Sequence, residues 1–216
     1  GVQTCALPIF ITPVSVMDIT ASVSKGKDVY SGEGHEFGLL DNDNTNFTLA
    51  VGLTPMDGVD MGASYGRDRF VSNQKSRNAN PPPDPTWTDP ARNWTLDNNE
   101  IVKTYMAYLD LEGFANAKAN VHASYERNDS DNAFAFGGPR IPALQATSAF
   151  VPLPNVVNEW SRFTVDVKYY FTPKVGVGLG YWCDKLDVTD WNTIDSNGPV
   201  GFTAATGIPR IDWLGG

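Results

Sequence analysis

Residues 160–186, WSRFTVDVKYYFTPKVGVGLGYWCDKL, contain two stretches of alternating apolar and polar residues on either side of a Thr172-Pro173-Lys174 turn. Strand side chains alternate between the two faces of a sheet, so each stretch predicts a strand with one apolar and one polar face. Each arm has about 12 residues, whereas an average globular strand has about 5 or 6 and a tilted membrane-crossing strand needs about 9 to 11. The pattern therefore predicts a hairpin long enough to span a bilayer.

The two faces define two sets of candidate functional residues. The apolar set is predicted to face lipid and consists of Phe163, Val165, Val167, Tyr169, Phe171, Val177, Leu179 and Tyr181. The polar set, taken from this hairpin and from similar strands, is predicted to face an aqueous lumen and consists of Asp60, Asn120, His122, Ser124, Asp166, Lys168 and Asp184.

The same alternation recurs along the chain, around residues 17–23, 47–65 and 101–125. In three hairpins the apolar series begins four residues after the proline of a Thr-Pro pair, at Met17, Val59 and Val177. Such a repeat of hairpins predicts an all-β fold, an antiparallel up-and-down meander of seven long strands. We expect this meander to be part of a large transmembrane β-barrel.

The predicted connections alternate between short and long. Short turns of three to five residues lie at one end, and the other end has long segments at residues 26–45, 71–99, 129–159 and 189–216. Outer-membrane barrels have short periplasmic turns and long extracellular loops, so we expect these segments to be extracellular. Aromatic residues near the expected strand ends suggest an interfacial girdle of Phe70, Tyr105, Tyr125, Trp160, Tyr169, Phe171 and Tyr181.

The two ends of the chain limit what it can form. Residues 1–9, GVQTCALPI, resemble the in-frame translation of a common sequencing-library adapter, so we exclude them as a probable adapter artefact and assign residues 10–216 to one partial outer-membrane barrel domain. Seven strands leave two unpaired edges, which are costly in lipid. We therefore expect this chain to be a fragment that forms an open, incomplete sheet.

Composition excludes several other classes. Mean hydropathy is −0.28, and the absence of an apolar run of about 18 residues argues against a helical membrane protein. The net charge of −9 argues against a nucleic-acid partner. With Cys5 set aside, Cys183 is the only cysteine and no CxxCH motif exists, so we expect no metal, haem or other cofactor. His122 and Ser124 could suggest nucleophilic catalysis, but no oxyanion hole is evident, and we expect no catalytic residue and no enzymatic activity.

Several motifs resemble the MtrB/PioB family of outer-membrane β-barrels, also called decahaem-associated barrels. They are Gly38–Asn44, Thr54-Pro55, Gly62–Gly66, Ser76-Arg77, Arg92–Asn98 and Gly207–Leu214. The resemblance spans most of residues 14–214. It implies a barrel that sheathes a multihaem c-type cytochrome and performs no redox chemistry itself. The cysteine pair that the family has near its mature N-terminus is absent from this sequence.

Two functional classes therefore remain. The first is a non-enzymatic bacterial outer-membrane barrel in contact with lipid, which acts either as the sheath of a multihaem cytochrome in transmembrane electron transfer or as a porin-like passive channel. The second is a soluble β-sandwich that binds carbohydrate through Trp87, Trp94, Trp191 and Trp213. A sandwich must cover its apolar face with a second sheet about 10 Å away, whereas a barrel leaves that face bare.

Overall fold

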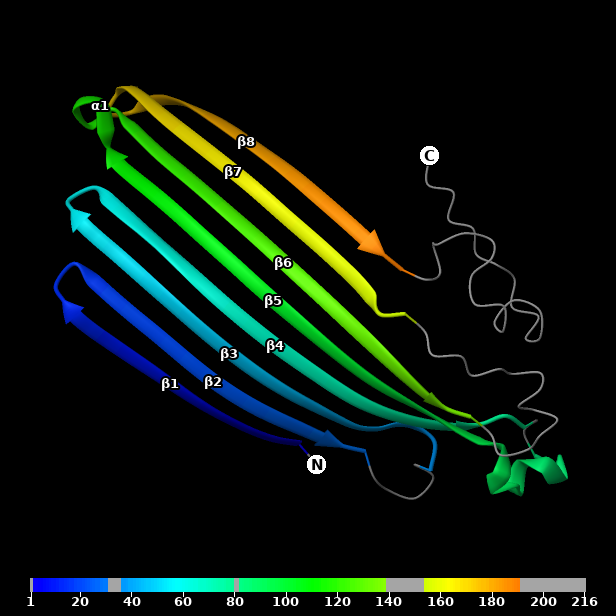
Figure 1. Ribbon diagram of the computed structural model, residues 1–216. Coiled ribbons are helices and arrows are strands. Elements are labelled where there is room, and N and C mark those ends of the chain that lie inside the picture. Colours follow the sequence, from blue (N-terminus) through cyan, green and yellow to red (C-terminus); the bar gives the residue numbers. More distant parts are fainter. Residues whose placement is uncertain (1, 31–35, 80–81, 139–153, 191–216) are drawn as a thin grey trace, which may run out of the picture.

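The strands form one antiparallel sheet in which every strand pairs with its neighbours in sequence, in the order β1 to β8 (Figure 1). The computed structural model describes residues 2–30, 36–79, 82–138 and 154–190 of the chain. The strands are β1 (Val2–Val14), β2 (Met17–Val29), β3 (Gly38–Met56), β4 (Val59–Arg77), β5 (Asn93–Gly113), β6 (Ala119–Gly137), β7 (Val156–Thr172) and β8 (Val175–Thr189). The prediction of an all-β up-and-down meander with long strands is confirmed.

The sheet is curved and open. In Figure 1 the edge strands β1 and β8 lie on opposite sides of the sheet, and no pairing joins them among the described residues. This confirms the expected open sheet. The prediction of seven strands is wrong by one, because residues 2–9, which we excluded, form most of β1 and pair with β2 from Val2↔Asp28 to Ile9↔Ala21. The adapter origin of residues 1–9 stays a prediction.

Tight turns close the hairpins at one end of the sheet. They lie at residues 15–16, 57–58 and 173–174, and a single turn labelled α1 (Phe114–Ala117) joins β5 to β6. In each of the three Thr-Pro hairpins the strand register shifts at or immediately before the proline. Proline has no amide hydrogen for the ladder, so it is accommodated where regular pairing stops.

The connections at the other end are much shorter than the predicted loops. The segments between strands are residues 30–37, 78–92 and 138–155, and the second of these contains the 3-10 turns η1 (Pro85–Thr88) and η2 (Pro90–Arg92). The predicted loop boundaries 26–45, 71–99 and 129–159 are therefore wrong. The end of β8 at Thr189 agrees to within one residue with the loop start predicted at residue 189. Residues 191–216 lie outside the described residues. The additional strand residues are polar, and their side chains form hydrogen bonds between neighbouring strands. Asn73 donates to Asp41, and Arg69 Nε donates to Asn99 at 2.8 Å.

The sheet is a single layer and has almost no buried core. Among the described apolar residues only Ala119 is buried, at 7% exposure, while Leu179 is 75% exposed. No second sheet covers the apolar face within the described ranges, contrary to what the β-sandwich alternative requires. Of the tryptophans in that alternative, Trp191 and Trp213 lie outside the described residues. No helix in the described part of the chain has the length and apolar character needed to cross a membrane.

Candidate functional site

Residue parity assigns each side chain to a face of the sheet. Between the register shifts, every pairing joins two odd-numbered or two even-numbered residues, as in Val121↔Val167 and His122↔Asp166. Strand side chains alternate, so the odd-numbered residues of all eight strands share one face, and the even-numbered residues share the other. We call these the odd face and the even face.

The odd face contains a continuous apolar belt beside the tight turns. Its cross-strand rows include Leu109↔Ala123↔Val165↔Tyr181 and Leu111↔Val121↔Val167↔Leu179. All eight residues predicted to face lipid lie on this face. Eight residue steps separate Phe163 from Phe171, which corresponds to roughly 27 Å along a strand that rises about 3.4 Å per residue. At a strand tilt of about 40° the belt is roughly 20 Å high, close to the ~25 Å apolar band of outer-membrane barrels.

Aromatic side chains border this belt on the side away from the turns. Phe47, Tyr65 and Tyr105 lie on successive strands, with ring centroids 6.3 Å apart for the first pair and 5.3 Å for the second. The series continues with the directly paired Tyr125 and Phe163 on β6 and β7. We call these five residues the aromatic row. At the turn end, Tyr169 and Phe171 are in edge contact at 5.3 Å.

Two residues of the predicted girdle lie elsewhere. Phe70 pairs with Asn44 and Glu100, and Trp160 pairs with Asn128 and Leu186, so both are on the even face. Their inclusion in a lipid-facing girdle was wrong, because position along a strand does not decide which face a side chain occupies.

The even face carries the predicted lumen-facing residues, and most make local polar contacts. The hydroxyl of Tyr108 donates to Asp60 Oδ1 at 2.9 Å, and Arg162 makes a two-point contact with Asp184 at 2.6 and 2.8 Å. The side-chain oxygen of Asn120 accepts the backbone N–H of Gly113 at 3.1 Å. These contacts create a hydrogen-bonded polar surface opposite the apolar belt.

The even-face His122 is engaged by a carboxylate and not by a serine. Its Nδ1 lies 2.6 Å from Asp110 Oδ1 across the β5–β6 pair. Ser124 lies opposite Tyr108 and Thr164. The described residues contain no group of three or more metal-ligating side chains. The arrangement is that of a polar row and offers no assembled catalytic triad.

The even face has low relief because long side chains lie across neighbouring glycines. A Cβ added to Gly62 would lie 2.6 Å from the ring of Tyr108, and one added to Gly180 would lie 2.6 Å from Asp166 Oδ1. Lys168 similarly passes 3.7 Å from the Cβ position of Gly178. The side chains of Tyr108, Asp166 and Lys168 therefore lie close to the backbone of the sheet.

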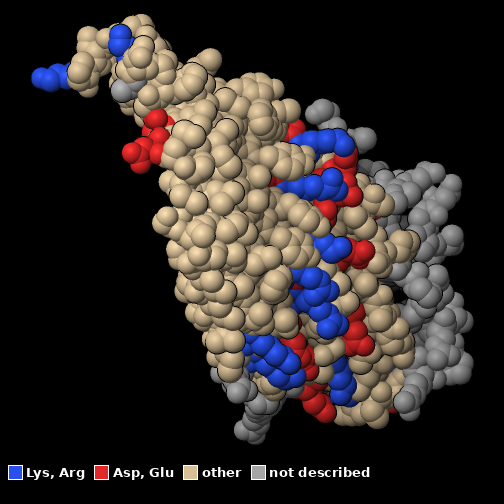
Figure 2. Space-filling view, turned by 60° about the vertical axis from the view of Figure 1, so that its left-hand side comes forward, with Lys and Arg blue, Asp and Glu red and all other residues tan. Residues whose placement is uncertain are grey.

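A charged band crosses the odd face just beyond the aromatic row, and it was not predicted from the alternation of apolar and polar residues. Figure 2 shows Lys, Arg, Asp and Glu gathered in a stripe across the strands beside a wide area without charges. By register and parity the band consists of Lys25, Lys27, Asp43, Arg67, Arg69, Lys103, Arg127, Asp129, Glu159, Lys185 and Asp187. The available signal was a charged residue two positions beyond an aromatic one, as in Tyr65-Gly-Arg67, Lys103-Thr-Tyr105 and Tyr125-Glu-Arg127.

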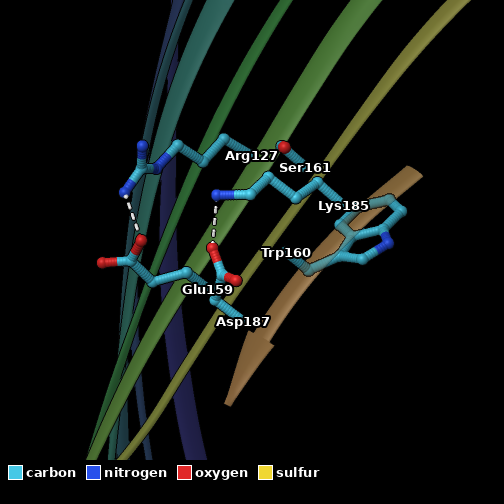
Figure 3. Close-up of a pocket in the computed structure, with 6 residues that line it drawn as sticks. All are labelled: Arg127, Glu159, Trp160, Ser161, Lys185 and Asp187. Carbon is cyan, nitrogen blue, oxygen red and sulfur yellow. Dashed lines mark ion pairs between the residues drawn. The ribbon is translucent and has the colours of Figure 1, made fainter. Parts of the chain in front are cut away.

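The band is internally ion-paired on β6 to β8. Arg127 contacts Asp129 at 2.7 Å and Glu159 at 3.2 Å, and Lys185 contacts Asp187 at 2.5 Å. Figure 3 shows the last two pairs side by side around a small pocket, with the Trp160 ring turned away from them. The band runs obliquely to the cross-strand rows. Its first charged residue, counted from the tight turns, lies in a row nearer those turns on β6 and β8 than on β2. Such an offset is expected when strands are tilted relative to a membrane plane.

A family model described as outer membrane beta-barrel porin, MtrB/PioB, matches residues 3–209 of the chain. No curated protein sequence matches it. The match covers nearly all of the chain, including β2 to β8 and all of β1 except its first residue.

Proposed function

The chain belongs to the MtrB/PioB family of outer-membrane β-barrel porins, and on that premise we propose that it is a non-enzymatic wall between lipid and a polar lumen. Its location is the bacterial outer membrane. In this proposal the odd face contacts lipid, through the belt that contains Val167 and Leu179. The even face, including Asp60 and His122, lines the lumen.

One observation carries this proposal. A single curved sheet exposes a belt roughly 20 Å high, calculated from the strand rise and a tilt of about 40°, with aromatic rings at both borders, and it opposes that belt with a hydrogen-bonded polar surface. Exposed apolar area of this extent is costly in water and is stabilised by hydrocarbon. Lipid on one side and water or a hydrophilic partner on the other satisfy both faces.

We propose further that the lumen holds a protein partner, a multihaem c-type cytochrome, and that the chain acts as its sheath in transmembrane electron transfer. The low relief of the even face supports this role, because Tyr108 and Asp166 lie over Gly62 and Gly180, close to the sheet, and a partner can therefore approach the wall. The even face is also acidic, with Asp18, Asp60, Asp68, Glu100, Asp110, Glu126, Asp166 and Asp184 against Arg162 and Lys168. Such a surface suits a partner with a basic exterior. A passive channel is the alternative use of the same lumen.

Purification of the tagged chain from outer membranes in mild detergent tests the sheath role. Haem-stained electrophoresis should reveal a covalently haem-bearing protein that co-purifies with the wild type. The double variant Asp60→Lys/Asp166→Lys should lose this partner, because it reverses lumen charges, whereas Asp57→Lys in the exposed β3–β4 turn should retain it. Recovery of a haem-free chain that makes vesicles permeable to small ions would instead favour the passive channel.

A further inference from the structure

Four cations form a compact group within the charged band on β2, β4 and β5. Lys25 and Arg69 both lie opposite Thr45, one on each side of β3, while Arg67 and Lys103 lie directly opposite each other on β4 and β5. We call Lys25, Arg67, Arg69 and Lys103 the cationic patch. Lys25, Arg69 and Lys103 are exposed, and Arg67 is half-buried.

The patch lacks the carboxylate partners that neutralise the rest of the band. None of the ion pairs among the described residues includes one of its four members. The nearest acid on β3, Asp43, is paired with Lys27 at 3.1 Å. Asp129 lies directly opposite Lys103 on β6, but its carboxylate is paired with Arg127 at 2.7 Å. Like charges placed directly opposite each other on neighbouring strands destabilise a sheet, so the Arg67–Lys103 pair is unfavourable unless an anion lies between them.

The surroundings of the patch indicate what kind of anion fits. A cleft on the odd face is lined by Lys25, Asp43, Thr45, Arg69 and Val71. Two cations and a hydroxyl therefore converge there, beside the Asp43 carboxylate that Lys27 neutralises. Immediately beside the patch, on the turn side, lie the rings of Phe47, Tyr65 and Tyr105, and beyond them the apolar belt begins. A ligand that matches both features has an anionic head and a long apolar tail.

We propose that the cationic patch binds the phosphate groups of a phosphorylated glycolipid in the outer leaflet, with the acyl chains lying along the belt below the aromatic row. Arginine forks such as that of Arg67 match phosphate oxygens in pairs, and Lys103 supplies a compact charge and further donors. This inference rests on the proposed function, because it requires the odd face to contact lipid and the loop end to be extracellular. It assigns a ligand to a surface that the barrel role alone leaves unspecified.

The position of the patch favours a lipid head group over free phosphate. Basic residues gain most from anionic lipid when they lie at the level of the head groups, and the interaction weakens within a Debye length of the surface. The aromatic row, which borders the patch, is the expected marker of that level. A free anion has no apolar tail, so its binding would not depend on the neighbouring apolar belt.

The test uses the whole chain inserted in phosphatidylcholine nanodiscs and titrated with bisphosphorylated lipid A, with dephosphorylated lipid A, or with inorganic phosphate. Binding is measured by native mass spectrometry. The wild type should bind the bisphosphorylated form at least about tenfold more tightly than the dephosphorylated form, and Arg67→Gln/Lys103→Gln should remove most of that preference. The control Lys168→Gln removes a positive charge from the even face of the same sheet and should retain the preference.

Each result has a defined meaning. Equal retention of bisphosphorylated lipid A by the wild type and the double variant would overturn the inference, as would equal binding of the two lipid forms by the wild type. Competition by millimolar inorganic phosphate would overturn the lipid assignment in favour of a small-anion site. Insertion into phosphatidylcholine nanodiscs separates the two levels of the proposal, because a chain that inserts without preferring lipid A refutes only the inference, whereas one that never inserts refutes the proposed function.

Discussion

Val167→Lys places a charge at the centre of the apolar belt. Val167 lies midway between Phe163 and Phe171 on β7, and its cross-strand neighbours on the odd face are Val121 and Leu179. No carboxylate lies on this row, so the new ammonium group would have no counter-ion. Half of a belt roughly 20 Å high leaves about 10 Å to either border, a distance that the four-carbon stem of lysine does not cover.

The expected cost follows from this depth. A lysine on the lipid face of an outer-membrane barrel destabilises it by about 2 to 4 kcal/mol at the midplane and by about 0 to 1 kcal/mol near an interface. We expect Val167→Lys to fall in the higher range. Thr164→Lys is the matched control, because it adds the same charge to the same strand on the even face, and we expect it to cost less than about 1 kcal/mol.

Urea titration of the chain folded in phosphatidylcholine vesicles, followed by tryptophan fluorescence, measures both free energies of unfolding. The result that would refute the reasoning is a Val167→Lys variant within about 0.5 kcal/mol of the wild type, the usual range for surface substitutions. Equal losses for Val167→Lys and Thr164→Lys would also refute it, since the two faces would then be energetically alike.

Three further predictions concern the same two faces. Tyr105→Ala should lower the free energy of unfolding in vesicles by at least about 0.5 to 1.5 kcal/mol, because it removes the ring contact with Tyr65, whereas Tyr105→Phe should remain near the wild type by the same titration. Asp184→Asn should leave the urea midpoint close to that of the wild type, because its ion pair with Arg162 is exposed, and a clear drop of that midpoint would contradict this. Cys183, which lies on the odd face, should react with a water-soluble maleimide in detergent-free urea but be protected in vesicles, and equal labelling in both would argue against lipid contact.

The face of each side chain could be predicted from the sequence because strand alternation is a local property. All of the residues predicted to face lipid are odd-numbered and all of those predicted to face a lumen are even-numbered, and the sheet keeps these two sets apart. That the faces meet lipid and water stays a prediction. The hydrophobic period identified the strands only where one face is apolar, so it missed the polar extensions of β3, β5 and β6 and made the loops too long.

The contacts across strands could not be predicted in the same way. Tyr65 and Tyr105 are 40 positions apart in the sequence, and nothing in either strand alone specifies that they pair. Likewise, Arg67 and Lys103 become a like-charge pair only in this register, while Arg127 acquires Glu159 as a partner. Small differences in hairpin register would have produced other neighbours.

The sequence by itself therefore determined which side chains share a face, how long the apolar part of each strand is, and that consecutive strands form hairpins. Only the tertiary structure decided which residues stand opposite each other, and so where the aromatic row, the ion pairs and the cationic patch lie. The physical reason is that alternation follows from the geometry of one extended chain, whereas register depends on backbone hydrogen bonds between strands and on the bulges that shift them.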